Sequence, residues 1–63
     1  MNKIPRFVKE YAAYQKRSIK GYDLMKADIK EKAIKKIDRT LIVLERGLIT
    51  VDEAMNLIMK CFE

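Results

Sequence analysis

The sequence predicts a small all-α protein of three helices, over residues 4–20, 22–46 and 51–62. Apolar residues recur at the helical spacings of three and four along most of the chain. Only two glycines and one proline interrupt its 63 residues, which leaves few points where a helix must stop. A charged fraction of 37% beside a hydrophobic fraction of 49% is typical of a small helical domain, not of a disordered tail. We therefore expect one small domain.

The first predicted helix, over residues 4–20, opens at Asn2 or Ile4 and has Pro5 in its first turn, where the missing N–H of proline is not needed. Cations in its last turns stabilise the negative end of the helix dipole. Two interpretations stay open at Gly21. Either the helix ends near Lys20, or one helix continues through Gly21 at a cost of about 1 kcal/mol relative to alanine. The predicted face toward the core consists of Ile4, Phe7, Val8, Tyr11 and Gln15, with Ala12 beside it and Ser18 or Ile19 continuing it.

The second predicted helix, over residues 22–46, has an apolar stripe with spacings mostly of four. Acid–base pairs in the favourable acid-first order, such as Glu31–Lys35, stabilise it further. Its last turns, from Leu41 to Leu44, are apolar on all sides, which predicts burial on more than one side. The stripe consists of Tyr22, Met25, Ile29, Ala33, Ile37, Leu41 and Leu44.

A tight corner at residues 47–50 joins the last two predicted helices. Gly47 lies where the chain leaves a helix, in the left-handed conformation that glycine adopts at little cost. Thr50 and Glu53 match a capping box, in which each side chain accepts a hydrogen bond from the other residue's backbone N–H. The third helix follows, with an apolar face on Val51, Ala54, Met55, Ile58 and Phe62.

The leucines before this corner and the Gly-x-Ile-Thr-x-x-Glu sequence from Gly47 to Glu53 resemble the short C-terminal helical-hairpin (SHOCT-like) domain of many bacterial proteins. The resemblance covers residues 37–61 and implies a small packing or oligomerisation unit without catalytic residues.

The same residues also follow the order of the second half of an EF-hand loop. Calcium binding is excluded, because the oxygen ligands of the first half would have to stand at Ile42, Leu44 and Arg46.

Positive charge is concentrated in the first half of the chain. Residues 1–36 hold eleven Lys and Arg against four Asp and Glu, a net charge of +7, whereas residues 37–63 carry −2. Such a basic half with interleaved tyrosines favours contact with nucleic acid or an acidic protein surface. Solvated lysines and core tyrosines are the alternative interpretation. The candidate contact residues are Lys9, Tyr14, Lys16, Arg17, Lys20, Lys30, Lys32, Lys35 and Lys36.

Several apolar residues of the last two predicted helices lie outside their main stripes. A chain of this size buries only about 60% of the surface that its unfolded form exposes, so few faces remain to cover these residues. Contiguous exposed apolar patches usually mark an interface. The sequence therefore predicts a homodimer or higher oligomer, with a compact monomer as the alternative. The candidate self-association residues are Ile42, Val43, Leu57 and Met59.

The inventory of side chains argues against an enzyme. There is no histidine to act as a general base, and the single cysteine, Cys61, has no histidine or second cysteine to pair with. No motif indicates a metal, a cofactor or a small-molecule substrate. No apolar run approaches the ~20 residues that cross a bilayer, and the N-terminal sequence does not match a secretory signal. The expectation is a cytoplasmic, non-enzymatic regulatory or accessory protein that acts by binding.

Overall fold

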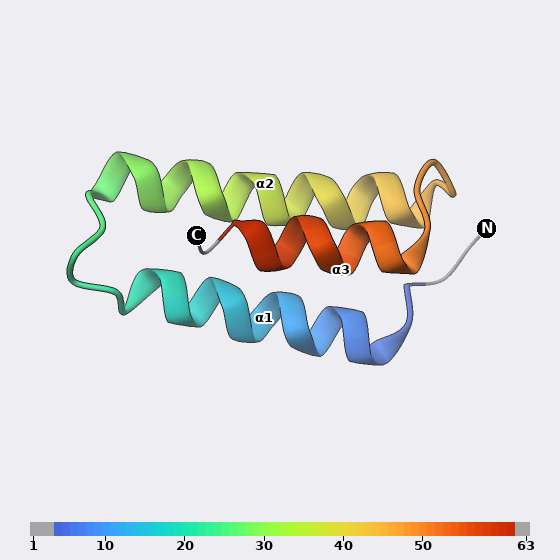
Figure 1. The fold of residues 1–63 in the computed structure, drawn as a ribbon, viewed down its shortest axis with the longest axis horizontal. Coiled ribbons are helices and arrows are strands. Elements are labelled where there is room, and N and C mark those ends of the chain that lie inside the picture. The colour runs from blue at the N-terminus through green and yellow to red at the C-terminus, as the bar shows by residue number, and fades with distance from the viewer. Residues whose placement is uncertain (1–3, 62–63) are drawn as a thin grey trace.

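The computed structural model describes residues 4–61, and this part of the chain folds into three α-helices: α1 (Arg6–Lys20), α2 (Ala27–Glu45) and α3 (Val51–Lys60). They pack side by side into an elongated bundle of 37 × 17 × 15 Å, in which each helix contacts the other two. α1 and α3 run in the same direction and α2 runs against them (Figure 1). The predicted all-α class with three helices is confirmed.

The connection between the first two helices is longer than the sequence predicts. α1 ends at Lys20 and the N–H of Gly21 closes its last turn on the carbonyl of Arg17, so the alternative of one continuous helix is wrong. The predicted start of the second helix at residue 22 is also wrong. Residues 21–26 form a loop, because a chain that reverses direction between packed helices needs several residues outside them. The loop residues Tyr22 and Met25 therefore do not belong to the α2 stripe.

The corner between α2 and α3 matches its prediction in detail. Gly47 has a φ of 75°, in the left-handed region, and the N–H of Leu48 donates to the carbonyl of Val43 at 3.0 Å. The N–H of Glu53 donates to the Thr50 hydroxyl at 3.1 Å, and the N–H of Thr50 donates to the Glu53 carboxylate at 3.3 Å. Both halves of the capping box are thus present. The predicted helix end at residue 62 lies outside the described residues.

One side of each helix forms the core. Two polar side chains are buried there, and both have partners. Gln15 of α1 donates to the carbonyl of Ile58 in α3 at 3.5 Å, and Thr40 donates to the carbonyl of Lys36 one turn earlier at 2.7 Å. Phe7, which the sequence placed on the apolar face of the first helix, is 57% exposed. The buried apolar residues are Val8, Ala12, Ile19, Ala33, Ile37, Leu44, Ala54 and Ile58.

Candidate nucleic-acid interface

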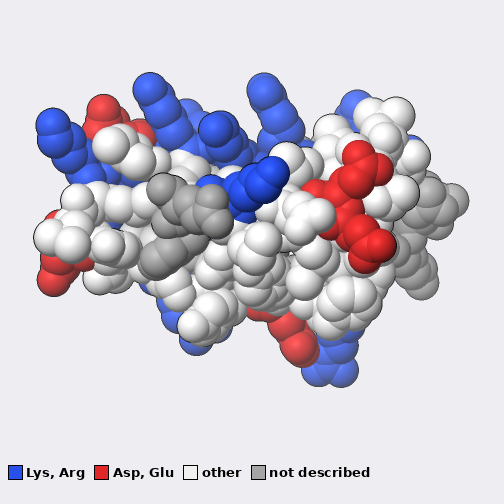
Figure 2. Space-filling model, viewed as in Figure 1, with Lys and Arg blue, Asp and Glu red and all other residues white. Residues whose placement is uncertain are grey.

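Basic side chains line the outer side of α2 and its groove with α3. A shallow cavity of about 810 Å³ extends along α2, and a second of about 430 Å³ lies between α2 and α3. Figure 2 shows Lys and Arg side chains gathered along the upper edge of the molecule, over α2. The cations of this surface, here called the basic face, are Lys32, Lys35, Lys36, Arg39 and Arg46 together with Lys60 of α3.

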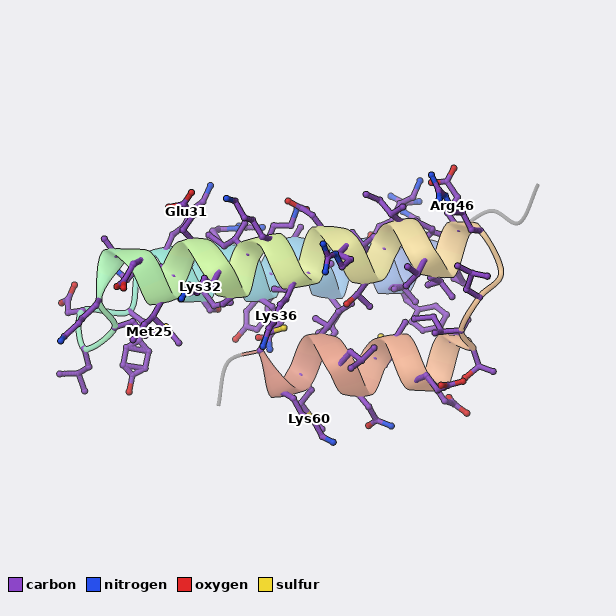
Figure 3. The ribbon with its side chains drawn as sticks, turned by 90° about the horizontal axis from the view of Figure 1, so that it is seen from above. Met25, Glu31, Lys32, Lys36, Arg46 and Lys60 are labelled. Atoms are coloured by element: carbon purple, nitrogen blue, oxygen red, sulfur yellow. The ribbon has the colours of Figure 1, made fainter. Side chains whose placement is uncertain are left out.

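The basic face follows from the spacing of its residues along one helix. Lys32, Lys36, Arg39 and Arg46 are four, three and seven residues apart, so they lie on one side of α2. With a rise of 1.5 Å per residue, this row is about 21 Å long. Figure 3 shows Lys36 extending from α2 toward the last turn of α3, whereas Lys60 points away from α2. The two helices together therefore hold the cations on a surface wider than one helix.

Most cations of the basic face lack an intramolecular partner. Lys35 pairs with Glu31 one turn away at 3.2 Å, and both side chains are exposed, so this pair contributes little. Asp38 lines the cavity along α2, but its carboxylate pairs with Lys16 of α1. Among residues 4–61, no carboxylate oxygen lies within 4.0 Å of a charged nitrogen of Lys32, Lys36, Arg39, Arg46 or Lys60.

The structure divides the predicted contact residues between several sides. Lys16 pairs with Asp38, and Lys30 donates to the carbonyl of Lys20 at 3.0 Å, so these lysines connect α1 and α2. Only three of the predicted contacts, Lys32, Lys35 and Lys36, belong to the basic face. The remaining predicted contacts, Lys9, Tyr14, Arg17 and Lys20, lie on α1.

Three of the six cations of the basic face were not predicted from the sequence. Arg39, Arg46 and Lys60 belong to the half of the chain with a net charge of −2, so a count of charge along the chain assigns them no role. The helical spacing of Lys32, Lys36 and Arg39 was the available signal. It marks a continuous cationic row only once the packing shows that this side of α2 faces away from the core.

Aromatic side chains lie away from this surface. Within the described part of the chain, no aromatic residue lines the cavities along α2 or between α2 and α3. Tyr14, 61% exposed, belongs to α1, and Tyr22 belongs to the loop before α2. Stacking of unpaired bases needs an aromatic platform beside the cations, and the basic face does not provide one.

The four candidate self-association residues also separate. Ile42 and Leu57 are 50% and 46% exposed and, with the half-buried Val43, form an apolar floor beneath the cations of the basic face. Met59 lies two residues beyond Leu57, about 200° around α3, and therefore on the opposite side of that helix. Apolar surface thus occurs in two places with different charge around it.

Cys61 lies at the end of the groove between α2 and α3 and is half-buried. Burial raises the pKa of its thiol above the ordinary value, and the nearby Lys36 charge opposes this in part. A thiol that stays protonated at neutral pH is a weak nucleophile.

Among residues 4–61, no three His, Cys, Asp or Glu side chains come together in a way that could hold a metal ion. None of the described helices has the length and apolar character of a membrane span.

Comparison of the chain with protein-family models, with curated proteins and with solved structures finds no match.

Proposed function

We propose that this chain is a non-enzymatic binding protein whose basic face contacts the phosphates of a nucleic-acid duplex. The supporting observation is the row of cations without carboxylate partners along about 21 Å of α2. Phosphates along a duplex offer one negative charge per ~1.7 Å of axis, and cations that neutralise them release condensed counterions. A row of fixed, unpaired cations on a rigid helix fits such a ligand.

Among residues 4–61, no aromatic side chain lines the basic face, which favours a duplex over a single strand. Proteins that hold single strands combine a basic groove with aromatic side chains on which bases stack. The basic face has Ile42 and Val43 between its cations instead. Phosphate contacts carry no sequence information by themselves, so the proposed binding is not sequence-specific.

The test is binding of a short labelled duplex, measured by fluorescence anisotropy across a salt series. The five cations of the basic face other than Lys35 can each contact one phosphate. Five such contacts predict a slope of about −4.5 for the logarithm of the affinity against the logarithm of the salt concentration. Replacing Lys32, Lys36 and Arg39 together by Glu should remove three contacts, reverse the local charge and lower the affinity by about a hundredfold or more. These side chains are exposed, so the helix content measured by circular dichroism should stay unchanged.

A matched control changes the net charge by the same amount elsewhere. Replacing Lys9, Arg17 and Lys20 of α1 by Glu should weaken binding much less, because these residues lie outside the basic face. Equal loss of affinity in the two triple variants would show that only the net charge of +5 attracts the duplex, and would contradict the proposal.

A second candidate partner is an acidic amphipathic helix of another protein. The groove between α2 and α3 favours it, because an apolar floor of Val43, Leu57 and Cys61 lies between Lys36, Arg39 and Lys60. A partner helix with apolar anchors and acidic flanks would match both parts of this groove.

One substitution in the groove distinguishes the two partners. Leu57→Asn removes an apolar contact without changing the charge, so it should weaken an acidic amphipathic peptide and leave duplex binding unchanged. Leu57 is 46% exposed, which allows the substitution without loss of the core. Weak duplex binding that vanishes near physiological salt, together with tight peptide binding that needs Leu57, would favour the protein partner.

A further inference from the structure

Apolar side chains also gather between α1 and α3, on the side of the bundle away from α2. Phe7, Tyr11 and Tyr14 are four and three residues apart and therefore form one row on α1. Phe7 and Tyr14 are 57% and 61% exposed. On α3, Met55 and Met59 form a second row, in which Met59 is 46% exposed. We call these five residues the α1–α3 face.

Two contacts show that these rows belong to the same side. Lys16 pairs with Asp38 and so faces α2, and Tyr14 lies about 200° around α1 from Lys16, toward α3. Leu57 lines the groove with α2, and Met59 lies about 200° around α3 from it, toward α1. Figure 2 shows largely uncharged surface below α3, where α1 and α3 lie side by side.

Charges of opposite sign border the two ends of the α1–α3 face. The hydrogen bond from Gln15 to the carbonyl of Ile58 fixes the register of these two parallel helices. On α1, Glu10 lies five residues before that contact and Arg17 lies two residues after it. α1 therefore has an acid at one end of the face and a cation about 10 Å further on.

The acidic end contains one cation as well. Arg6 pairs with Glu10 at 3.2 Å, but both side chains are largely exposed, so the pair is weak and open to exchange. Asp52 adds another acid at this end, three residues before Met55. Figure 2 shows acidic side chains at the first turn of α3.

We propose that a second copy of this chain docks on the α1–α3 face, with the two-fold axis across the helices. Each helix then lies antiparallel to its own copy. This arrangement places Glu10 opposite Arg17 of the partner subunit. A two-fold axis along the helices would instead bring Glu10 against Asp52 of the partner subunit, an acid against an acid. The charge pattern therefore selects the antiparallel dimer.

The same reasoning disfavours self-association through the basic face. Two copies joined there would bring the cations around Ile42 against each other, and like charges in contact oppose association. The α1–α3 face lies opposite α2, so the proposed dimer keeps the two basic faces apart. A stable interface buries about 800 Å² per partner, roughly a sixth of the 4949 Å² of this chain, which one side of the bundle is large enough to supply.

The mass in solution, measured by sedimentation equilibrium over a concentration series, tests the proposal. The unmodified chain should approach twice its 7.4 kDa as concentration rises. Tyr14→Asp and Met59→Asp should each raise the dimer dissociation constant about tenfold or more, because each buries a charge in the interface. Ile42→Asp is the matched control: Ile42 and Met59 have similar exposed fractions, 50% and 46%, but Ile42 lies on the basic face.

A charge exchange tests the orientation. Glu10→Lys and Arg17→Glu should each weaken the dimer, and the double variant should recover it, since each new charge again meets its opposite. Both exchanged residues are exposed, so circular dichroism should show that each variant stays helical. A chain that stays monomeric throughout, an Ile42→Asp effect equal to that of Met59→Asp, or a double variant without recovery would each overturn the proposal.

Discussion

Cys61 shows how one residue reports on its surroundings. Its thiol lies in the groove between α2 and α3, where burial disfavours the charged thiolate and raises the pKa, while the Lys36 ammonium favours the thiolate and lowers it. The burial effect is the larger of the two. The residue therefore behaves as a small hydrophobic side chain that closes one end of the groove.

We expect alkylation of Cys61 by iodoacetamide to show a pH–rate midpoint above that of a short unstructured peptide containing the same residue. Lys36→Gln should raise the midpoint further, because the charge that stabilises the thiolate is lost. The midpoint is used instead of the rate, since easier access to the thiol changes the rate but not the midpoint. Lys9→Gln, on α1, should leave it unchanged. A midpoint that falls in Lys36→Gln would contradict the assignment.

α1 and α2 are each followed by a glycine, and the two glycines have different roles. Gly21 follows α1 with a φ of −88°, which any residue adopts, whereas Gly47 follows α2 with a φ of 75°. The corner after Gly47 is fixed on both sides, by the bond from Leu48 to Val43 and by the Thr50 capping box, a cap worth about 1 kcal/mol. The loop after Gly21 has no comparable cap at the start of α2.

Substituting each glycine by alanine should therefore change stability in opposite directions. At Gly21, a Cβ atom would lie 3.6 Å from the carbonyl oxygen of Arg17, an ordinary contact, so Gly21→Ala should stabilise by about 0.4–1 kcal/mol. Gly47→Ala should destabilise by about 1–2 kcal/mol, because the side chain meets the backbone in the left-handed conformation. Urea unfolding followed by circular dichroism measures both. Equal effects of the two substitutions would contradict this interpretation.

At the scale of the whole molecule, two unlike surfaces lie on opposite sides of one bundle. The basic face covers α2, and the α1–α3 face lies between the other two helices. If both proposals hold, the dimer presents two basic faces that point away from each other. One dimer would then hold two duplexes at once, which a monomer with one basic face does not do.

Bridging is measurable with two duplexes, one immobilised and one fluorescent. The unmodified chain should capture the fluorescent duplex on the immobilised one. Tyr14→Asp should bind the immobilised duplex with similar single-site affinity but capture much less of the fluorescent one, because Tyr14 lies on the α1–α3 face and not on the basic face. Undiminished capture by a variant shown to be monomeric would mean that one chain has two duplex sites, against the proposed arrangement.

The sequence by itself determined the helices, the corner and most of the core. Helical periodicity placed Val8, Ile37 and Ile58 inside, and the capping box placed the start of α3 at Val51. These features depend on residues a few positions apart, so they are legible in the order of the residues. The start of α2 was wrong because the length of the loop depends on how far the chain must travel between two packed helices.

Only the tertiary structure decided which surface residues lie together. Charge counted along the chain pointed to the N-terminal half, but Lys16 is paired with Asp38, and the cations without partners include Arg39, Arg46 and Lys60 from the other half. Likewise, Leu57 and Met59 are neighbours in sequence and lie on opposite sides of α3. A surface combines rows from different helices, and the register and rotation of those helices are set by packing between residues far apart in the chain.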